Sequence, residues 1–199
     1  MTDQPPPDEA TATPADYEAT LEAKRQEKDR FFADHPQSPI PPEERESFKG
    51  LEYFPPNPTY RVPAIVSLEA DPEASPVPID TSADRTLRYL RVATLTFDLE
   101  RDDHDLEDGT YELAAYSQDG SLESLFVPFR DKTTGQQSYR GGRYMELGVE
   151  GDLADGQELI VDFNLAYSPF CAFSETFECP LPPQENWLEV AIPAGEKAP

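Results

Sequence analysis

The side chains best suited to chemistry are concentrated in the last third of the chain, between residues 128 and 197. Asp131, Tyr139 and Arg143 lie within one short stretch there, and two glycines directly precede the arginine. An arginine that a carboxylate orients can bind an anion through two parallel hydrogen bonds, and adjacent glycines let a backbone approach closely. We therefore predict a small-molecule or anion site that includes Asp131, Tyr139 and Arg143.

Three further polar residues extend this predicted ligand site along the chain: Asn164, Tyr167 and Asn186. Asp162 stands in an apolar, strand-like stretch and is the expected partner of Arg143. Such a pair can be an anion-binding arginine with its orienting carboxylate, or it can be a buried structural tie. We favour the structural tie.

Asp131 also has a purely local interpretation. The stretch from Asp131 to Gly135 is typical of a turn, because an aspartate accepts hydrogen bonds from the backbone two residues on and glycine supplies a positive φ. We favour this turn over a direct role of Asp131 in binding.

Histidine is scarce, which restricts the enzyme chemistry available. The chain has two histidines, His35 in an expected linker and His104 in an expected acidic loop. A Ser-His-Asp triad or a histidine metal site therefore has little material. A hydrolase-like or other enzyme would have to use carboxylate, tyrosine or cysteine chemistry, and its candidate catalytic residues are Asp162, Cys171 and Glu185.

The two cysteines, Cys171 and Cys179, are separated by seven residues. Zinc knuckles have two to four residues between ligands, so these cysteines are weak candidates for metal ligands and need help from other side chains. Buried structural thiols are the favoured interpretation. A reactive thiol would need a lowered pKa, and this acidic chain offers few cations to lower it. The residues do not identify a cofactor.

The composition is strongly acidic, with 40 acidic and 16 basic side chains and a net charge of −24. Such a surface repels the phosphates of nucleic acids and anionic membranes, so neither is an expected partner. Strand-like apolar segments recur along the chain, which argues against an acidic disordered protein. We therefore predict a folded protein from the cytoplasm of a halophilic organism, while the oligomeric state is not specified.

Removing salt should therefore unfold the protein. At about 1 M salt the Debye length is about 3 Å, which screens most of the repulsion among the carboxylates. Circular dichroism during dialysis into dilute buffer should show the loss of structure. Full folding in dilute buffer would contradict a halophilic origin.

The sequence also bears on the compartment. No apolar run reaches the roughly 18 residues that span a bilayer, and no charged and then apolar leader opens the chain. We therefore expect a soluble cytoplasmic protein. In that compartment, two cysteines are expected as thiols or ligands more than as an obligatory disulfide.

The elements that must position these residues follow from the changing pattern along the chain. Residues 1–12 are acidic and rich in proline, and we expect them to be disordered. Residues 13–50 are expected to form a helical arm that packs on the domain, with a long helix over 14–33 and a short one over 42–48. Residues 51–197 are expected to form the β domain.

The β domain is predicted from period-two patterns that begin near residue 60. Pro63 argues for an edge strand there, and Asp119-Gly120 is a hairpin signal. Strands are expected at about 60–68, 77–79, 87–97, 110–117, 124–129, 142–148, 158–164 and 187–192. About eight or nine strands without intervening helices predict a mainly β fold, either an antiparallel sandwich or a partly open barrel, with an N-terminal helical arm.

The chain resembles the domain-of-unknown-function family numbered 1684, over about residues 15–197. The resemblance is carried by these groups of residues: Pro128-Phe129-x-Asp131-x-Thr133-x-Gly135; Tyr139 with Gly142-Arg143-Tyr144; Asp162-Phe163-Asn164-x-Ala166-Tyr167-x-Pro169-x-Cys171-Ala172-Phe173; and Cys179-Pro180-Leu181-Pro182-Pro183-x-Glu185-Asn186-x-Leu188. The resemblance implies no established activity, but it points to the same C-terminal region.

Three functions are compatible with these residues. The first, which we favour, is a β domain that binds a small molecule or an anion. The second is an enzyme, which the scarcity of histidine disfavours. The third is a structural or interaction protein, in which the polar motifs only hold the fold together. A pocket lined by the candidate residues would favour the first two, and mutual hydrogen bonds without a cavity would favour the third.

Overall fold

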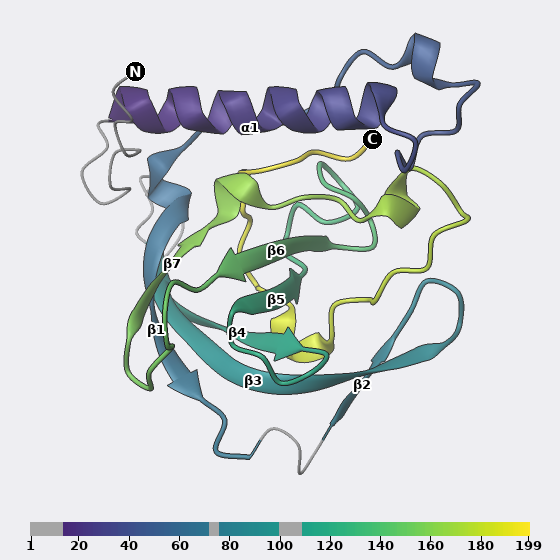
Figure 1. Ribbon diagram of the computed structural model, residues 1–199. Coiled ribbons are helices and arrows are strands. Elements are labelled where there is room, and N and C mark those ends of the chain that lie inside the picture. Colours follow the sequence, from purple (N-terminus) through teal and green to yellow (C-terminus); the bar gives the residue numbers. More distant parts are fainter. Residues whose placement is uncertain (1–13, 72–75, 100–108) are drawn as a thin grey trace, which may run out of the picture.

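The computed structural model describes residues 14–71, 76–99 and 109–199. The predicted tail at residues 1–12 and nearly all of the predicted acidic loop, including His104, lie outside the described residues. The described part combines one long helix with one curved antiparallel sheet (Figure 1). Within those three ranges, no helix combines the length and the apolar character that a membrane crossing requires.

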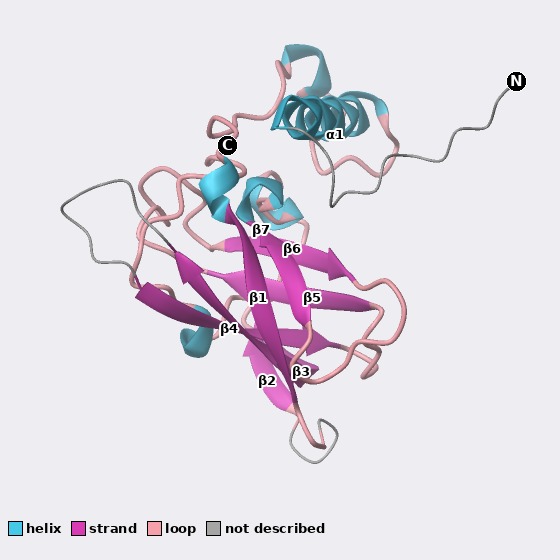
Figure 2. Ribbon diagram, turned by 90° about the vertical axis from the view of Figure 1, so that its left-hand side faces the viewer, coloured by secondary structure: helices cyan, strands magenta, loops and turns pink. Residues whose placement is uncertain are grey.

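The sheet has seven strands in the order β6-β5-β4-β3-β1-β7, and β2 pairs with the first residues of β3. All of these pairings are antiparallel, and the sheet curves into a half-barrel (Figure 2). The strands are β1 (Arg61–Leu68), β2 (Val77–Asp80), β3 (Thr86–Leu99), β4 (Gly109–Ser117), β5 (Ser124–Phe129), β6 (Arg143–Gly148) and β7 (Glu158–Asp162).

The interior of the half-barrel holds the main hydrophobic core, because alternate residues of each strand point to it. Leu113, Val127 and Met145 represent three neighbouring strands in this core, and each is at most 1% exposed. The segment that follows β7 also contributes residues to this core. Phe163 and Ile192 are two of them, and both are fully buried. The polar C-terminal motifs are therefore wrapped around the same core that the strands build.

Mainly β structure with an N-terminal helix was predicted correctly, but the number of strands was not. Seven strands form one open half-barrel, whereas about eight or nine strands in an antiparallel sandwich or partly open barrel were predicted. The strand expected at 187–192 is absent from the described structure. Its backbone groups pair with residues 130–132 instead, since Leu188 N donates to the carbonyl of Arg130 and Lys132 N donates to that of Val190.

The prediction that Pro63 marks an edge strand was wrong, because β1 lies between β3 and β7. The register with β3 begins at Ala64, so Pro63 lies in the part of β1 that has only β7 beside it. Proline is tolerated there because no ladder to β3 has started. The predicted hairpin at Asp119-Gly120 does join β4 to β5, and Gly120 has a φ of +80°.

The helix α1 (Pro14–Asp34) agrees with the prediction of a helix over 14–33 and lies across one end of the half-barrel (Figure 1). Leu21, Arg25 and Phe32 are its buried residues, with spacings of four and seven that place them on one face. The short helix expected over 42–48 is a single 3-10 turn, Arg45–Ser47. The other 3-10 turns are Pro58–Tyr60, Phe163–Leu165, Phe170–Ala172 and Gln184–Asn186.

Candidate functional site

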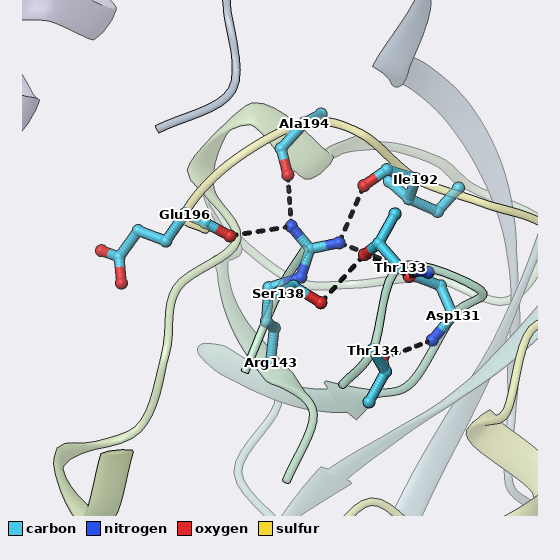
Figure 3. Close-up of polar contacts among 8 residues, drawn as sticks. All are labelled: Asp131, Thr133, Thr134, Ser138, Arg143, Ile192, Ala194 and Glu196. Atoms are coloured by element: carbon cyan, nitrogen blue, oxygen red, sulfur yellow. Dashed lines mark hydrogen bonds and ion pairs between the residues drawn. The ribbon is translucent and has the colours of Figure 1, made fainter. Parts of the chain in front are cut away.

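Arg143, the centre of the predicted ligand site, begins β6 and is 1% exposed inside the half-barrel. Its guanidinium donates to the carbonyls of Ile192 (2.8 Å), Ala194 and Glu196 (3.2 Å) and to the carboxylate of Asp131 (Figure 3). Burial lowers the pKa of Arg143, and the Asp131 charge acts in the opposite direction. The donors of Arg143 thus point at the chain's own last residues.

Asp131 forms the turn that the sequence indicated, and it also holds Arg143. One carboxylate oxygen accepts from the backbone N–H and the hydroxyl of Thr133, at 2.5 and 2.6 Å. The other accepts from Arg143. The Thr133 hydroxyl also contacts that of Ser138 at 2.9 Å (Figure 3). The carboxylate therefore joins the 131–138 turn to β6, with no part of it open to solvent.

The predicted pair between Arg143 and Asp162 does not exist. The Asp162 carboxylate instead accepts from the hydroxyl of Tyr17 on α1, at 2.9 and 3.0 Å, and lies 3.8 Å from Arg61 Nε. Asn164 donates to Asp162 and exchanges two hydrogen bonds of 2.9 Å with the backbone of Asn57. The prediction failed because α1, which crosses the end of β7, supplies the partner. Asp162 therefore fastens α1 to the sheet, and Asn164 holds the segment at Asn57 that leads into β1.

Asn186 is fully buried and bridges β4 and β5 where few ladder hydrogen bonds join them. The register between β4 and β5 contains a single pair, Tyr116 with Phe126. Beside that pair the Asn186 amide accepts from Ala114 N (2.8 Å) and donates to the carbonyls of Ala114 (2.8 Å) and Pro128 (2.7 Å). One side chain thus replaces the missing ladder bonds between the two strands.

Glu196 is a buried polar residue that the sequence analysis did not single out. Its carboxylate is paired with Lys28 of α1 and accepts from the backbone N–H of Ser168 at 2.8 Å. Burial raises the pKa of Glu196, and Lys28 opposes this shift. The pair ties α1 to the same C-terminal segment that Arg143 holds. Because Lys28 and Glu196 lie 168 residues apart in the chain, no local sequence pattern predicts this contact.

A hollow lies on the opposite face of the sheet from the core. It is an open pocket of about 640 Å³. The second face of β4, β5 and β6 contributes Tyr116, Phe126 and Tyr144 to it, with Glu146 at the rim. The full lining is Tyr89, Tyr116, Ser117, Gln118, Asp119, Ser121, Glu123, Ser124, Phe126, Tyr144, Glu146, Tyr167 and Pro180.

Five aromatic rings form a continuous row along this pocket. Neighbouring ring centroids are 4.9–6.5 Å apart, in stacked or edge-to-face arrangements that suit aromatic pairs. The row runs Tyr116, Tyr89, Phe126, Tyr144, Tyr167. Tyr167 is the one residue of the predicted ligand site that lies here; Asp131, Tyr139, Arg143, Asn164 and Asn186 do not line the pocket.

The phenol groups of the row are held by the protein. Tyr116 donates to Glu185, Tyr144 to the carbonyl of Pro180, and Tyr167 to Glu146 at 2.9 Å. Burial raises the pKa of each of these three phenols, and the carboxylates beside Tyr116 and Tyr167 raise it further. The tyrosines therefore stay neutral and do not act as acid–base groups. Tyr116 is fully buried and Tyr89 and Tyr144 are nearly so, which leaves Phe126 and Tyr167 as the partly exposed rings of the row.

Tyr139 and the cysteines form a separate group. The Tyr139 hydroxyl lies 3.5 Å from the carbonyl of Cys171 and 3.9 Å from its sulfur. The N–H of Cys171 donates to the sulfur of Cys179 at 3.3 Å, and both are free thiols. Within the described residues, no three His, Cys, Asp or Glu side chains are grouped as metal ligands would be. Glu185, a predicted catalytic candidate, contacts Tyr116 and Arg91.

The aromatic pocket was missed because the strand pattern was used for one face only. Tyr116, Phe126 and Tyr144 are at even positions of three strands whose odd positions build the core. In the register of β4 with β5 and of β5 with β6, even-numbered residues lie opposite even-numbered residues. The even-numbered side chains of all three strands therefore share one face of the sheet. Aromatic residues at the outward positions of neighbouring strands were the available signal.

Comparisons with known proteins agree with the motifs. Residues 46–197 match the family model described as "Protein of unknown function (DUF1684)". The solution NMR structure of an uncharacterised protein of Haloarcula marismortui is 56% identical, with a TM-score of 0.69, over 92% of this chain and 95% of that chain. The comparison with curated proteins finds no match. Because the family model covers most of the chain, the protein belongs to the DUF1684 family of proteins of unknown function.

Proposed function

We propose that this protein is a binding domain for a small organic cation, and that the aromatic pocket is its site. The row of five aromatic rings in an open pocket of about 640 Å³ is the observation that carries the proposal. Ligand pockets have volumes of roughly 300–1,000 Å³ and are mostly apolar with a few placed polar groups. Ring faces attract cations, most strongly when the cation is partly desolvated.

The charges around the rings support the choice of a cation. Asp119, Glu123 and Glu146 contribute to the lining, and no Lys, Arg or His is among the described residues that form it. Hydrogen bonds from the Ser121 N–H and the Ser117 hydroxyl lower the pKa of Asp119, so this carboxylate stays ionised. An anionic ligand would be repelled by this pocket, and a neutral one would leave its charges unused.

Tyr167 provides an internal example of the contact that we propose. The ammonium of Lys28 lies 4.6 Å from the centroid of the Tyr167 ring. That ring also packs edge-to-face against Tyr144, with centroids 5.8 Å apart. The pocket thus belongs to an aromatic row whose last ring already contacts one cation of the protein itself. A ligand ammonium over the partly exposed ring of Phe126, beside the edges of Tyr89 and Tyr144, would make the same kind of interaction.

Choline and its uncharged analogue 3,3-dimethylbutan-1-ol make a direct test, because they share shape and differ in charge. In NMR titrations at about 1 M KCl, where long-range attraction is screened, choline should shift the ring resonances of Tyr89 and Phe126. It should bind at least about fivefold more tightly than the alcohol, given about 1–2 kcal/mol for a cation over aromatic rings. Equal binding of the two, or none, would refute the proposal.

Glu146→Gln separates charge recognition from shape. Glutamine keeps an acceptor for the Tyr167 hydroxyl but removes the rim charge. We expect choline binding to weaken several-fold and binding of the alcohol to stay unchanged. Glu158→Gln is the matched control, because Glu158 is exposed on β7 at the other edge of the sheet. If both variants weaken choline binding equally, the effect belongs to the net charge and not to the pocket.

We also propose that the protein works in the concentrated salt of a halophilic cytoplasm. The net charge of −24 and the 56% identical protein of Haloarcula marismortui support this. In such a medium the interaction between the protein and a charged ligand must act at short range, since charges more than a few ångströms apart are screened. Aromatic rings in direct contact with a cation meet that condition better than surface carboxylates alone.

A further inference from the structure

The two cysteines are in contact although they come from different segments. Cys171 lies in the 3-10 turn Phe170–Ala172, and Cys179 follows an irregular turn. The backbone N–H of Cys171 donates a hydrogen bond to the sulfur of Cys179 at 3.3 Å, and both cysteines are free thiols. The Cys179 sulfur therefore lies directly against Cys171 in the folded protein.

Each cysteine is fixed by a separate part of the fold. The backbone of Cys179 exchanges hydrogen bonds with Ser82 in the turn between β2 and β3, at 2.9 and 3.1 Å. Cys171 is held from the other side, where its carbonyl and sulfur both lie near the Tyr139 hydroxyl. Because the Cys179 sulfur already contacts the backbone of Cys171, the two side chains can be joined without moving the backbone far, which is the geometric requirement for a disulfide.

The two thiols differ in access and in acidity. Cys171 is partly exposed, whereas Cys179 is buried, with 7% of its surface accessible. The pKa of Cys171 is lowered to about 6, chiefly by its interaction with the Cys179 side chain; Tyr139 and Ser82 contribute to this lowering, and burial opposes it. The same contact with Cys171, and burial, raise the pKa of Cys179. The ionisable groups around the pair are Tyr89, Tyr139, Tyr144 and Tyr167, with Arg140 beside Tyr139.

We propose that Cys171 and Cys179 form a redox-active dithiol that a hydroperoxide converts to an intramolecular disulfide. The Cys171 thiolate attacks the outer oxygen of the peroxide, the O–O bond breaks, and Cys171 becomes a sulfenic acid while hydroxide or alkoxide leaves. The sulfur of Cys179 then attacks the Cys171 sulfur. An S–S bond forms, the sulfenic oxygen leaves as hydroxide, and the proton of Cys179 converts it to water.

The roles of the two residues follow from their positions. The partly exposed Cys171, which has the lower pKa, attacks the peroxide because a thiolate is a much stronger nucleophile than a thiol. The buried Cys179 lies next to Cys171 and converts its sulfenic acid to a disulfide before a second peroxide can oxidise the sulfenic acid further. The expectation that this acidic chain could not activate a thiol considered only cations. Here hydrogen-bond donors, and not cations, lower the pKa of Cys171. The proposed reaction does not depend on whether the aromatic pocket binds a ligand.

The full-length protein at pH 7 and high salt provides the test, with hydrogen peroxide as the probe. One equivalent should yield a protein lighter by two hydrogens, and digestion without reductant should give one peptide pair joined through Cys171 and Cys179. Iodoacetamide should alkylate Cys171 at least about tenfold faster than Cys179 in the reduced protein. Oxidation to sulfinic acid without a disulfide, or equal alkylation of both thiols, would overturn the proposal.

Two single variants assign the steps. Cys179→Ser should stop at a sulfenic acid on Cys171, which dimedone traps, because no resolving thiol remains. Cys171→Ser should not react with one equivalent of peroxide, because the remaining thiol is buried. Tyr139→Phe removes one donor to Cys171 and should slow its alkylation while leaving circular dichroism unchanged. A Cys171→Ser protein that is oxidised as fast as the parent would refute these roles.

Discussion

Replacing Arg143 with methionine should lower the free energy of unfolding by about 3–5 kcal/mol, the largest loss that we expect from a single substitution. Methionine has a similar length, so the loss arises from groups that are left behind. The carboxylate of Asp131 would remain buried without its counter-charge, and the carbonyls of Ile192 and Ala194 would lose their donor. Urea unfolding in high salt, followed by circular dichroism, measures the change.

Arg88→Met is the matched control, because it removes the same charge from an exposed site on β3. It should change the unfolding free energy by less than about 0.5 kcal/mol. The double variant Asp131→Asn, Arg143→Met should be more stable than Arg143→Met alone, since it removes the unpaired charge. If Arg143→Met unfolds at the same denaturant concentration as Arg88→Met, the buried network does not stabilise the protein.

Substituting Gly195 with alanine should cost about 2–5 kcal/mol, from two separate penalties. Gly195 has a φ of +77°, a left-handed conformation that costs an alanine about 1–2 kcal/mol. A Cβ atom there would also lie 2.5 Å from the carbonyl oxygen of Ala166 and 2.7 Å from that of Phe163. Relief of this clash would move the segment that carries the Arg143 acceptors, Ala194 and Glu196.

Gly151→Ala isolates the first penalty from the second. Gly151 has nearly the same φ, +76°, but a Cβ there meets nothing within 4 Å. Its substitution should cost only about 1–2 kcal/mol. Thermal unfolding of both variants in the same salt compares them directly. Equal losses would mean that the C-terminal segment can shift away from Ala166 at no cost, so that the contact is not rigid.

Local patterns predicted most of the secondary structure. The helix over 14–33, the hairpin at Asp119-Gly120 and the turn at Asp131 each depend on residues close in sequence, and each is present. The strand expected at 187–192 failed because the same apolar alternation also suits an extended segment inside the half-barrel. Burial pattern alone does not say whether a neighbouring strand or a turn will take the backbone hydrogen bonds.

The candidate site could be predicted in composition but not in arrangement. The polar residues at 143, 162 and 186 were recognised as unusual, yet they are paired with backbone carbonyls and a helix residue far away in the chain. Arg143 illustrates the reason: three of its four acceptors are carbonyl oxygens, which every residue carries and no sequence pattern marks. Side-chain identity predicted that Arg143 needs a partner, and only the fold determines which one.

The acceptors of Arg143 also set the order of events during synthesis. When a ribosome has added residue 190, all seven strands of the sheet have been made, but the carbonyls of Ile192, Ala194 and Glu196 have not. The guanidinium of Arg143 must therefore stay hydrated until those residues have been added to the chain. The interior of the half-barrel therefore closes only after residues 192–196 have been translated, and not while the strands of the sheet are being made.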